Sequence, residues 1–318
     1  MRGRPRPGAV RLGLALALAA TATASCRGTS SSSDRQAPGT TAASTTAVVP
    51  SGFGPPVLLG QISDEAVTES SGLVASRRNP GRLWTHNDSD NPPLLFCVEP
   101  DGGSCGRWTV AGASNVDWED IAAGPGPQPG EHYLYVGDIG DNTESRAEVV
   151  VYRVVEPVVA PSSGTPAPGG TTAPATALRL HYPDGPHDAE SLMVHPTTGD
   201  LYVVTKALGA TAVYQAPPEG GALTRVATLG LGPLALVTGG DISPDGQRVA
   251  LCTLLGGFEL AVDPADRAGF DAVWSRPAAA VALPGRGQGE GIAYRLDGNA
   301  LLVTSEGSPS PLFEVARR

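Results

Sequence analysis

The fold is decided by residues 115–142, which read NVDWEDIAAGPGPQPGEHYLYVGDIGDN. Acidic residues precede a short apolar run at 121–123. A Gly/Pro-rich turn, a second apolar run at 132–136 and a second acidic group at 138–142 follow. Two apolar runs joined by such a turn predict a β-hairpin. Since the first strand of a hairpin starts where the second one ends, both acidic groups are expected on the same side.

Variants of this unit recur at four other places. Their central apolar residues lie 48, 71, 50 and 50 residues apart and are Leu73, Ile121, Leu192, Ile242 and Ile292. The longest interval contains a Pro/Gly/Ser/Thr-rich insert at 160–176, which predicts a disordered loop. Without the insert the period is close to 50 residues, and most copies contain four short strands. Four strands at this period are typical of a β-propeller blade.

The last copy stops after its third strand, at the C-terminus. Residues 57–62 form a predicted strand with no hairpin partner of its own. If this strand completes the last blade, the ring closes and no edge is left unpaired. The sequence therefore predicts an all-β fold, a five-bladed β-propeller over residues 57–318. A six-bladed ring and a β-sandwich are the alternatives, although a sandwich does not explain the period.

The N-terminal residues have the layout of an export signal. Residues 1–25 carry four arginines and then an apolar core that is too short to span a membrane. Residues 22–24 fit ordinary cleavage, whereas 23–26 resemble a bacterial lipobox that would place a lipid on Cys26. Residues 26–56 are rich in Ser, Thr, Ala, Gly and Pro, which predicts a flexible tether. We expect a lipoprotein on the outer face of the cytoplasmic membrane, with plain secretion as the alternative.

Composition and motifs exclude several classes of function, and cysteine spacing predicts a disulfide. With 22 basic and 32 acidic residues and no basic stripe, the chain is not expected to bind nucleic acid. The sequence contains no Gly-x-Ser-x-Gly elbow and no P-loop, which disfavours serine hydrolysis and nucleotide hydrolysis. Cys97 and Cys105 flank a turn and are expected to form a disulfide after export, while Cys252 is expected to be a buried thiol. A monomer is expected.

Acidic residues gather where first strands start and second strands end. In a propeller these positions meet at one mouth of the central channel. They hold Glu69, His86, Asn87, Asp88, Asp117, Glu119, Asp120, Asp138, Asp141, Asn142, Asp188, Glu190, Lys206, Asp241, Glu290 and Glu306.

So many carboxylates repel one another, and a divalent cation would relieve the repulsion. Oxygen ligands suit Ca²⁺ or Mg²⁺. The expected metal ligands are Glu119, Glu190, Asp241, Glu290 and Asn142. In the alternative interpretation, the acids only accept backbone hydrogen bonds between blades.

Several motifs carry a resemblance to a known group of proteins. They are Ser71-Gly72-Leu73, Trp84 to Asp88, Asp117 to Ala122, Gly137 to Asn142, Asp188 to Leu192 and Gly289 to Ala293. From about Val57 to Arg318 the chain resembles secreted actinobacterial β-propeller lipoproteins of uncharacterised activity. More distantly, the Glu-Asp-Ile-Ala and Glu-Gly-Ile-Ala strand starts are similar to those of phytase-like esterase and gluconolactonase-type propellers. That resemblance implies a calcium or other divalent ion over the channel and hydrolysis of phosphate or carboxylic esters.

Two hypotheses about function follow. In the first, the protein is a metal-dependent hydrolase of small anionic esters, a phosphatase, esterase or lactonase. Asp138 or Asp188 would be the base, and Lys206 would hold an anionic group. In the second, the propeller is a non-catalytic module that binds a partner in the cell envelope.

Overall fold

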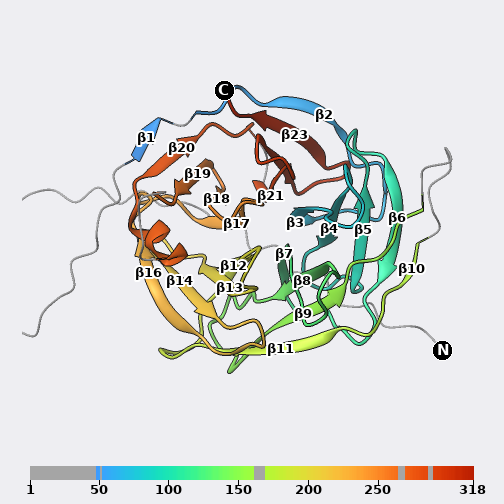
Figure 1. Ribbon diagram of the computed structural model, residues 1–318, viewed down its shortest axis with the longest axis horizontal. Coiled ribbons are helices and arrows are strands. Elements are labelled where there is room, and N and C mark those ends of the chain that lie inside the picture. Colours follow the sequence, from blue (N-terminus) through green and yellow to red (C-terminus); the bar gives the residue numbers. More distant parts are fainter. Residues whose placement is uncertain (1–47, 51, 161–168, 264–268, 286–288) are drawn as a thin grey trace, which may run out of the picture. The chain divides into compact units, whose positions relative to one another are not determined.

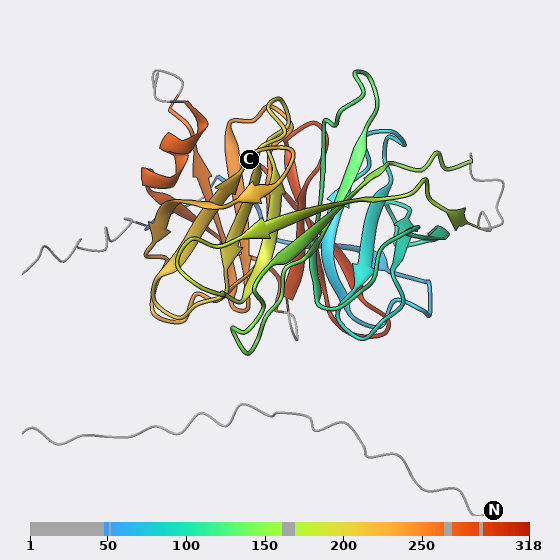
Figure 2. The ribbon, with the colours of Figure 1, turned by 90° about the horizontal axis from the view of Figure 1, so that it is seen from below.

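The computed structural model describes residues 48–50, 52–160, 169–263, 269–285 and 289–318. The predicted signal, Cys26 and most of the predicted tether lie outside these residues. The described residues belong to one compact unit, Ala42–Arg318. They form five sheets arranged as blades around a central axis (Figure 1). Figure 2 shows the ring from the side, with loops on two opposite faces.

Each blade is an antiparallel sheet whose first strand lies innermost. The innermost strands are β3 (Ser70–Ala75), β7 (Trp118–Gly124), β12 (Ala189–Val194), β17 (Val237–Ile242) and β21 (Gly289–Tyr294). The second strands are β4 (Leu83–Asn87), β8 (Tyr133–Asp138), β13 (Leu201–Thr205), β18 (Arg248–Thr253) and β22 (Ala300–Ser305). The third strands are β5 (Leu94–Val98), β9 (Val149–Val155), β14 (Thr211–Ala216), β19 (Gly256–Ala261) and β23 (Pro311–Ala316). The fourth strands are β6 (Ser104–Thr109), β11 (Thr176–His181), β16 (Thr224–Leu229), β20 (Ala278–Val281) and β2 (Val57–Gln61).

The ring closes as the sequence predicts. β2, from the start of the domain, pairs antiparallel with β23, so that Val57 faces Glu314 and Gln61 faces Pro311. In Figure 1 the blue β2 lies beside the red β23. The pairing gives blade 5 its fourth strand and covers the edge that the C-terminal strand would otherwise expose. The five-bladed prediction is confirmed, and the described residues build no sixth sheet.

Three short strands extend the outer edges. β1 (Val48–Pro50), β10 (Gly170–Thr171) and β15 (Gly221–Ala222) pair in parallel with β20, β6 and β11. β1 lies at the end of the predicted tether, so this part of the tether pairs with blade 4. β10 lies in the insert predicted to be disordered, and that prediction is wrong for Gly170–Thr171, while 161–168 lie outside the described residues.

The hydrophobic core lies between neighbouring blades. Trp84 of blade 1 and Trp118 of blade 2 are fully buried in one cluster, where Trp84 also meets Trp108 edge to face at 5.1 Å. The predicted disulfide joins Cys97 to Cys105 across β5 and β6, and Cys252 is a buried thiol. The single 3₁₀ helix among the described residues, η1 (Phe270–Ser275), packs on β16, and no helix there is long and apolar enough to cross a membrane.

Candidate metal centre at the channel mouth

Strand pairing defines one level at which the five blades can be compared. The first residue of each innermost strand pairs with the last residue of the second strand. These pairs are Ser70 with Asn87, Trp118 with Asp138, Ala189 with Thr205, Val237 with Thr253 and Gly289 with Ser305. We call this end of the channel the mouth.

A register shift follows the pair in every blade, so one extra residue bulges out of the first strand. The residue next to the pair is Ser71 in blade 1, Glu119 in blade 2, Glu190 in blade 3, Thr238 in blade 4 and Glu290 in blade 5. Three of the five blades therefore offer a glutamate at this position. All three glutamates were predicted metal ligands.

Asp241 does not share this position, and the predicted alignment of blade 4 is wrong by two residues. Pairing shows that Gly240, rather than Ile242, is equivalent to the central apolar residues of the other blades. A Cβ atom on Gly240 would lie 2.5 Å from Ser191 Oγ, so a large apolar residue has no room there. Asp241 lies three residues beyond Thr238, accepts the Tyr294 N–H at 2.8 Å and has Arg77 as its charged neighbour.

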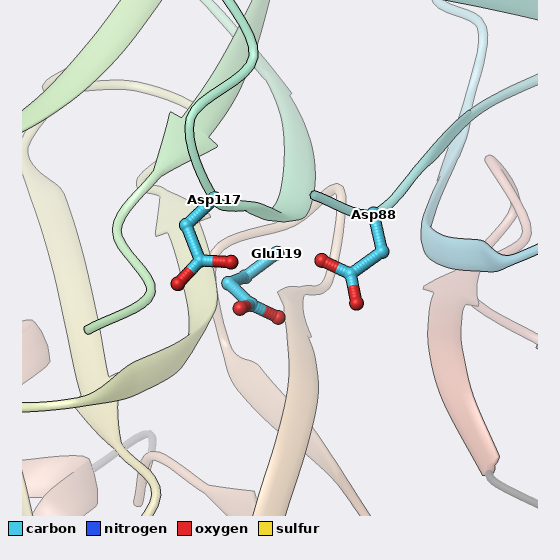
Figure 3. Close-up of side chains that lie close together, drawn as sticks. All are labelled: Asp88, Asp117 and Glu119. Atoms are coloured by element: carbon cyan, nitrogen blue, oxygen red, sulfur yellow. The ribbon is translucent and has the colours of Figure 1, made fainter. Parts of the chain in front are cut away.

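A compact cluster of carboxylates forms between blades 1 and 2. Asp88 lies in the loop after β4, Asp117 directly precedes β7, and Glu119 is in β7. One oxygen from each carboxylate lies within 4.8 Å of the other two, and Figure 3 shows the three side chains pointing toward one another. Asp88 and Asp117 were not among the predicted ligands, although both occupy the acidic positions at strand starts and ends.

Glu190 and Glu290 add two deeply buried carboxylates from blades 3 and 5. Their exposed fractions are 6% and 7%, and the Oε2 atom of each has no hydrogen-bond partner among the described residues. The other oxygen of Glu190 pairs with the Lys206 ammonium group. An unpartnered buried carboxylate oxygen is costly, so these two atoms point to a ligand.

Burial and mutual repulsion raise the pKa values throughout the cluster. Burial is the largest cause in each case, and neighbouring carboxylates add to it. The pKa rises to about 6 for Asp88, about 6 for Asp117, about 7 for Glu190 and about 9 for Glu290, and that of Glu119 lies well above its ordinary value. These carboxyl groups therefore resist ionisation together unless a cation neutralises them.

The donor set is made of carboxylate oxygens, which hard divalent cations such as Ca²⁺ and Mg²⁺ prefer. Asp88, Asp117 and Glu119 could hold such an ion because their oxygens converge. Glu190 and Glu290, whose charges act on Glu119, each keep an oxygen without a hydrogen-bond partner among the described residues.

The other predicted site residues have different surroundings. Asp138 accepts the N–H groups of Val116 and Asp117, each at 3.2 Å, and forms a salt bridge with Arg146 at 2.8 Å. Asp138 therefore holds the backbone of Asp117 in place. Asp188 accepts the Asp141 N–H at 2.9 Å and raises the pKa values of Asp117 and Glu190, which places it beside the cluster.

Asn142 is exposed in the loop after β8.

Asp120 has the structural role that the alternative interpretation gives the acids, because it accepts backbone hydrogen bonds between blades. It is fully buried, and its Oδ2 atom accepts the Leu192 N–H at 2.9 Å and the Gly240 N–H at 3.2 Å. One carboxylate thus joins the innermost strands of blades 2, 3 and 4. Asp120 and Asp241 serve as backbone hydrogen-bond acceptors between blades, whereas none of the three glutamates accepts a backbone N–H from the part of the chain that the structure describes.

Fold and site together define a five-bladed propeller with a carboxylate-lined channel mouth. No protein-family model matches the chain, and no curated protein matches it.

Solved structures that it is similar to include a glutaminyl cyclase from Myxococcus xanthus (13% identity, 82% of this chain and 95% of that chain covered, TM-score 0.46). They also include a luciferin-regenerating enzyme (11%, 82% and 95%, 0.43) and a gluconolactonase from Xanthomonas campestris (12%, 87% and 99%, 0.42). At these values the similarities carry no argument about activity.

Proposed function

We propose that the protein is an exported, lipid-anchored β-propeller that binds calcium or magnesium at the channel mouth and hydrolyses small phosphate or carboxylic esters there. The observation that carries the proposal is the convergence of Asp88, Asp117 and Glu119 within 4.8 Å, with the buried carboxylates of Glu190 and Glu290 close enough to raise the pKa of Glu119.

The electrostatics of the cluster support cation binding. Two ionised carboxylates at 4.8 Å repel by about 3 kcal/mol at an effective dielectric constant of about 20. Three such groups, with the charges of Glu190 and Glu290 acting on Glu119, can avoid this cost only by holding protons or by binding a cation. A divalent cation changes each repulsion into an attraction, and it competes with protons for the same oxygens.

The residues around the cluster supply the remaining parts of a hydrolytic site. A bound cation would act as a Lewis acid toward the ester. Asp188 lies beside the cluster with one oxygen used by the Asp141 N–H, so its other oxygen is suited to accept a proton from water. Asp138 is less suited to this role, because backbone groups and Arg146 already occupy it. Lys206 orients Glu190, and its ammonium group has further N–H donors for an anionic group of the substrate.

Export and lipid attachment are supported by the N-terminal sequence and by the resemblance to actinobacterial lipoproteins. Cys26 lies 22 residues before β1, which leaves a tether between the lipid and blade 4. The test is fractionation of cells that produce the full chain. The unmodified chain should be found with membranes, and Cys26→Ser should be released in soluble form. Release of both forms would contradict the lipid anchor.

Calcium titration of the exported chain carrying Cys26→Ser tests the site. Calcium should raise the Tm and give a saturable heat signal in calorimetry, and Glu119→Gln should abolish both effects. Glu65→Gln, which changes an exposed glutamate, is the matched control. If neither calcium nor magnesium binds, the carboxylates are structural.

A panel of phosphate, aryl and lactone esters tests the reaction. Turnover should require the cation and should be lost in Glu190→Gln and Asp188→Asn. Cation binding without turnover of any ester would contradict the hydrolase and favour the non-catalytic binding module.

A further inference from the structure

The carboxylate cluster draws on two blades, and one amide side chain connects its two halves. Asp88 follows β4 in blade 1, whereas Asp117 and Glu119 belong to the start of β7 in blade 2 (Figure 3). Asn115 lies two residues before Asp117 and is half-buried. Its Nδ2 atom donates to the Asp88 carbonyl at 2.7 Å and to the Asn87 carbonyl at 3.3 Å. The amide therefore connects the loop that carries Asp88 to blade 2.

The same amide is anchored on its own blade. Its Oδ1 atom accepts the Trp118 N–H at 3.1 Å. The indole N–H of Trp118, whose side chain is fully buried, donates to the Ser114 carbonyl at 2.8 Å. A backbone N–H on one side of the amide and two backbone carbonyls on the other determine which way Asn115 points. Residues 114–118 thus form a base from which Asn115 reaches blade 1.

This amide supplies the hydrogen bonds that tie the loop after β4 to blade 2 within the described part of the chain. The N–H of Asp88, by contrast, donates to the Glu69 carbonyl of its own blade at 3.2 Å. On the other side, Asp138 accepts the Asp117 N–H at 3.2 Å and holds that residue to β8. Each half of the cluster is thus attached to its own blade, and Asn115 joins the two halves.

The connection opposes electrostatic repulsion. The charge of Asp88 raises the pKa of Asp117, and the charges of both raise the pKa of Glu119, so these acids repel one another when ionised. A loop relieves such repulsion by moving away. Asn115 holds the loop through backbone carbonyls, which carry no net charge, and its amide occupies no carboxylate oxygen of the cluster. Those oxygens therefore stay available for a cation.

We propose that Asn115 is a positioning residue of the cation site, which fixes the spacing between the carboxylate of blade 1 and those of blade 2. It thereby sets the affinity of the site and its selectivity for the size of the cation. This inference rests on the proposed function, because it requires a cation held by Asp88 together with Asp117 and Glu119. Losing a group that orients a metal ligand costs about 10–100-fold in metal affinity. Oxygens held at a fixed spacing favour one cation radius, whereas a site that can open accepts a wider range.

Asn115→Ser tests the role in the exported chain carrying Cys26→Ser. A serine hydroxyl can still accept the Trp118 N–H, but it is too short to reach the Asp88 carbonyl. In calorimetry, calcium should bind Asn115→Ser about 10–100-fold more weakly. In EDTA, the variant and its parent should unfold at the same urea concentration, because the lost bonds held repelling groups together. Asn299→Ser, which changes an exposed asparagine before β22, is the matched control and should alter neither result.

Trivalent lanthanides, titrated from lanthanum to lutetium, provide the readout of selectivity, because they share one charge while their radius decreases along the series. The affinity of the parent protein should depend on the radius of the ion, and Asn299→Ser should keep this dependence. In Asn115→Ser the dependence should become flatter, since the loop that carries Asp88 can then adjust to each ion. A loss of global stability alone would leave the dependence on radius unchanged.

The outcomes separate this inference from the proposed function. An unchanged calcium affinity or an unchanged dependence on radius in Asn115→Ser overturns the inference and leaves the cation site standing. Equal destabilisation of Asn115→Ser in EDTA and in calcium also overturns it, since that result makes the amide a structural bond. If calcium does not bind the parent protein, the proposed function and the inference that rests on it fail together.

Discussion

Replacing Glu290 by glutamine should have opposite effects on stability with and without calcium. Glu290 is 7% exposed, and its pKa rises from 4.5 to about 9, first through burial and then through Glu306 and the other carboxylates. Without a cation, the folded protein keeps a proton on Glu290 at neutral pH that the unfolded chain has released. The glutamine variant carries a neutral group of the same shape in both states.

The pKa values set the direction and the size of the effect. A carboxyl group with a raised pKa in the folded state does not penalise folding below pH 4.5, and its penalty grows as the pH rises toward 9. Each pH unit costs about 1.4 kcal/mol, so at pH 7 the penalty is about 3 kcal/mol. In EDTA, the free energy of unfolding of Glu290→Gln should therefore exceed that of the unmodified protein by about 3 kcal/mol at pH 7, and the two should converge near pH 4.5.

Urea unfolding between pH 4.5 and 8, in EDTA and in calcium, measures these differences. In calcium the order should reverse, because the cation stabilises the unmodified protein by mass action and binds the variant more weakly. Glu65→Gln should follow the unmodified protein in both buffers. Parallel pH profiles for Glu290→Gln and the unmodified protein in EDTA would refute the reasoning, since they would mean that the Glu290 carboxylate is hydrated.

Three further experiments test the stability of the ring. Asp120→Ala leaves backbone N–H groups of three blades without an acceptor, at about 1–3 kcal/mol each, so urea unfolding should show a loss of several kcal/mol. Gly72→Ala places a Cβ atom 2.6 Å from the Ile121 nitrogen and should lower the Tm, whereas Gly52→Ala, with no atom within 4 Å, should not. Removing the disulfide with Cys97→Ser and Cys105→Ser should cost about 2.5 kcal/mol in urea unfolding, because the bond closes a short loop of the unfolded chain.

The ring could be predicted because each of its blades is encoded locally. Alternating apolar residues, turns and a period near 50 residues specify the four strands of each blade. The last blade lacked a fourth strand, and the predicted strand at 57–62 had no partner, so the two could be matched. The disulfide between Cys97 and Cys105 was predicted for the same reason, since the two residues lie on adjacent strands of one hairpin, where Cys97 pairs with Gly106 beside Cys105. The error in blade 4 had a local cause as well. Gly240 stands where the other copies have a large apolar residue. The sequence alignment therefore placed Ile242, the nearest large apolar residue, at this position.

The amino-acid sequence by itself determined the five blades, the closing strand and the gathering of acids at one mouth. Only the tertiary structure decided which acids meet. Asp88 joins Asp117 and Glu119 from another blade, and Asp120 turns to backbone N–H groups. Glu190 and Glu290 each keep an oxygen that has no partner among the described residues. The physical reason is that the spacing of residues along the sequence fixes how high a side chain lies within its own blade. Its neighbours in other blades depend on bulges and on how closely the blades pack around their shared axis.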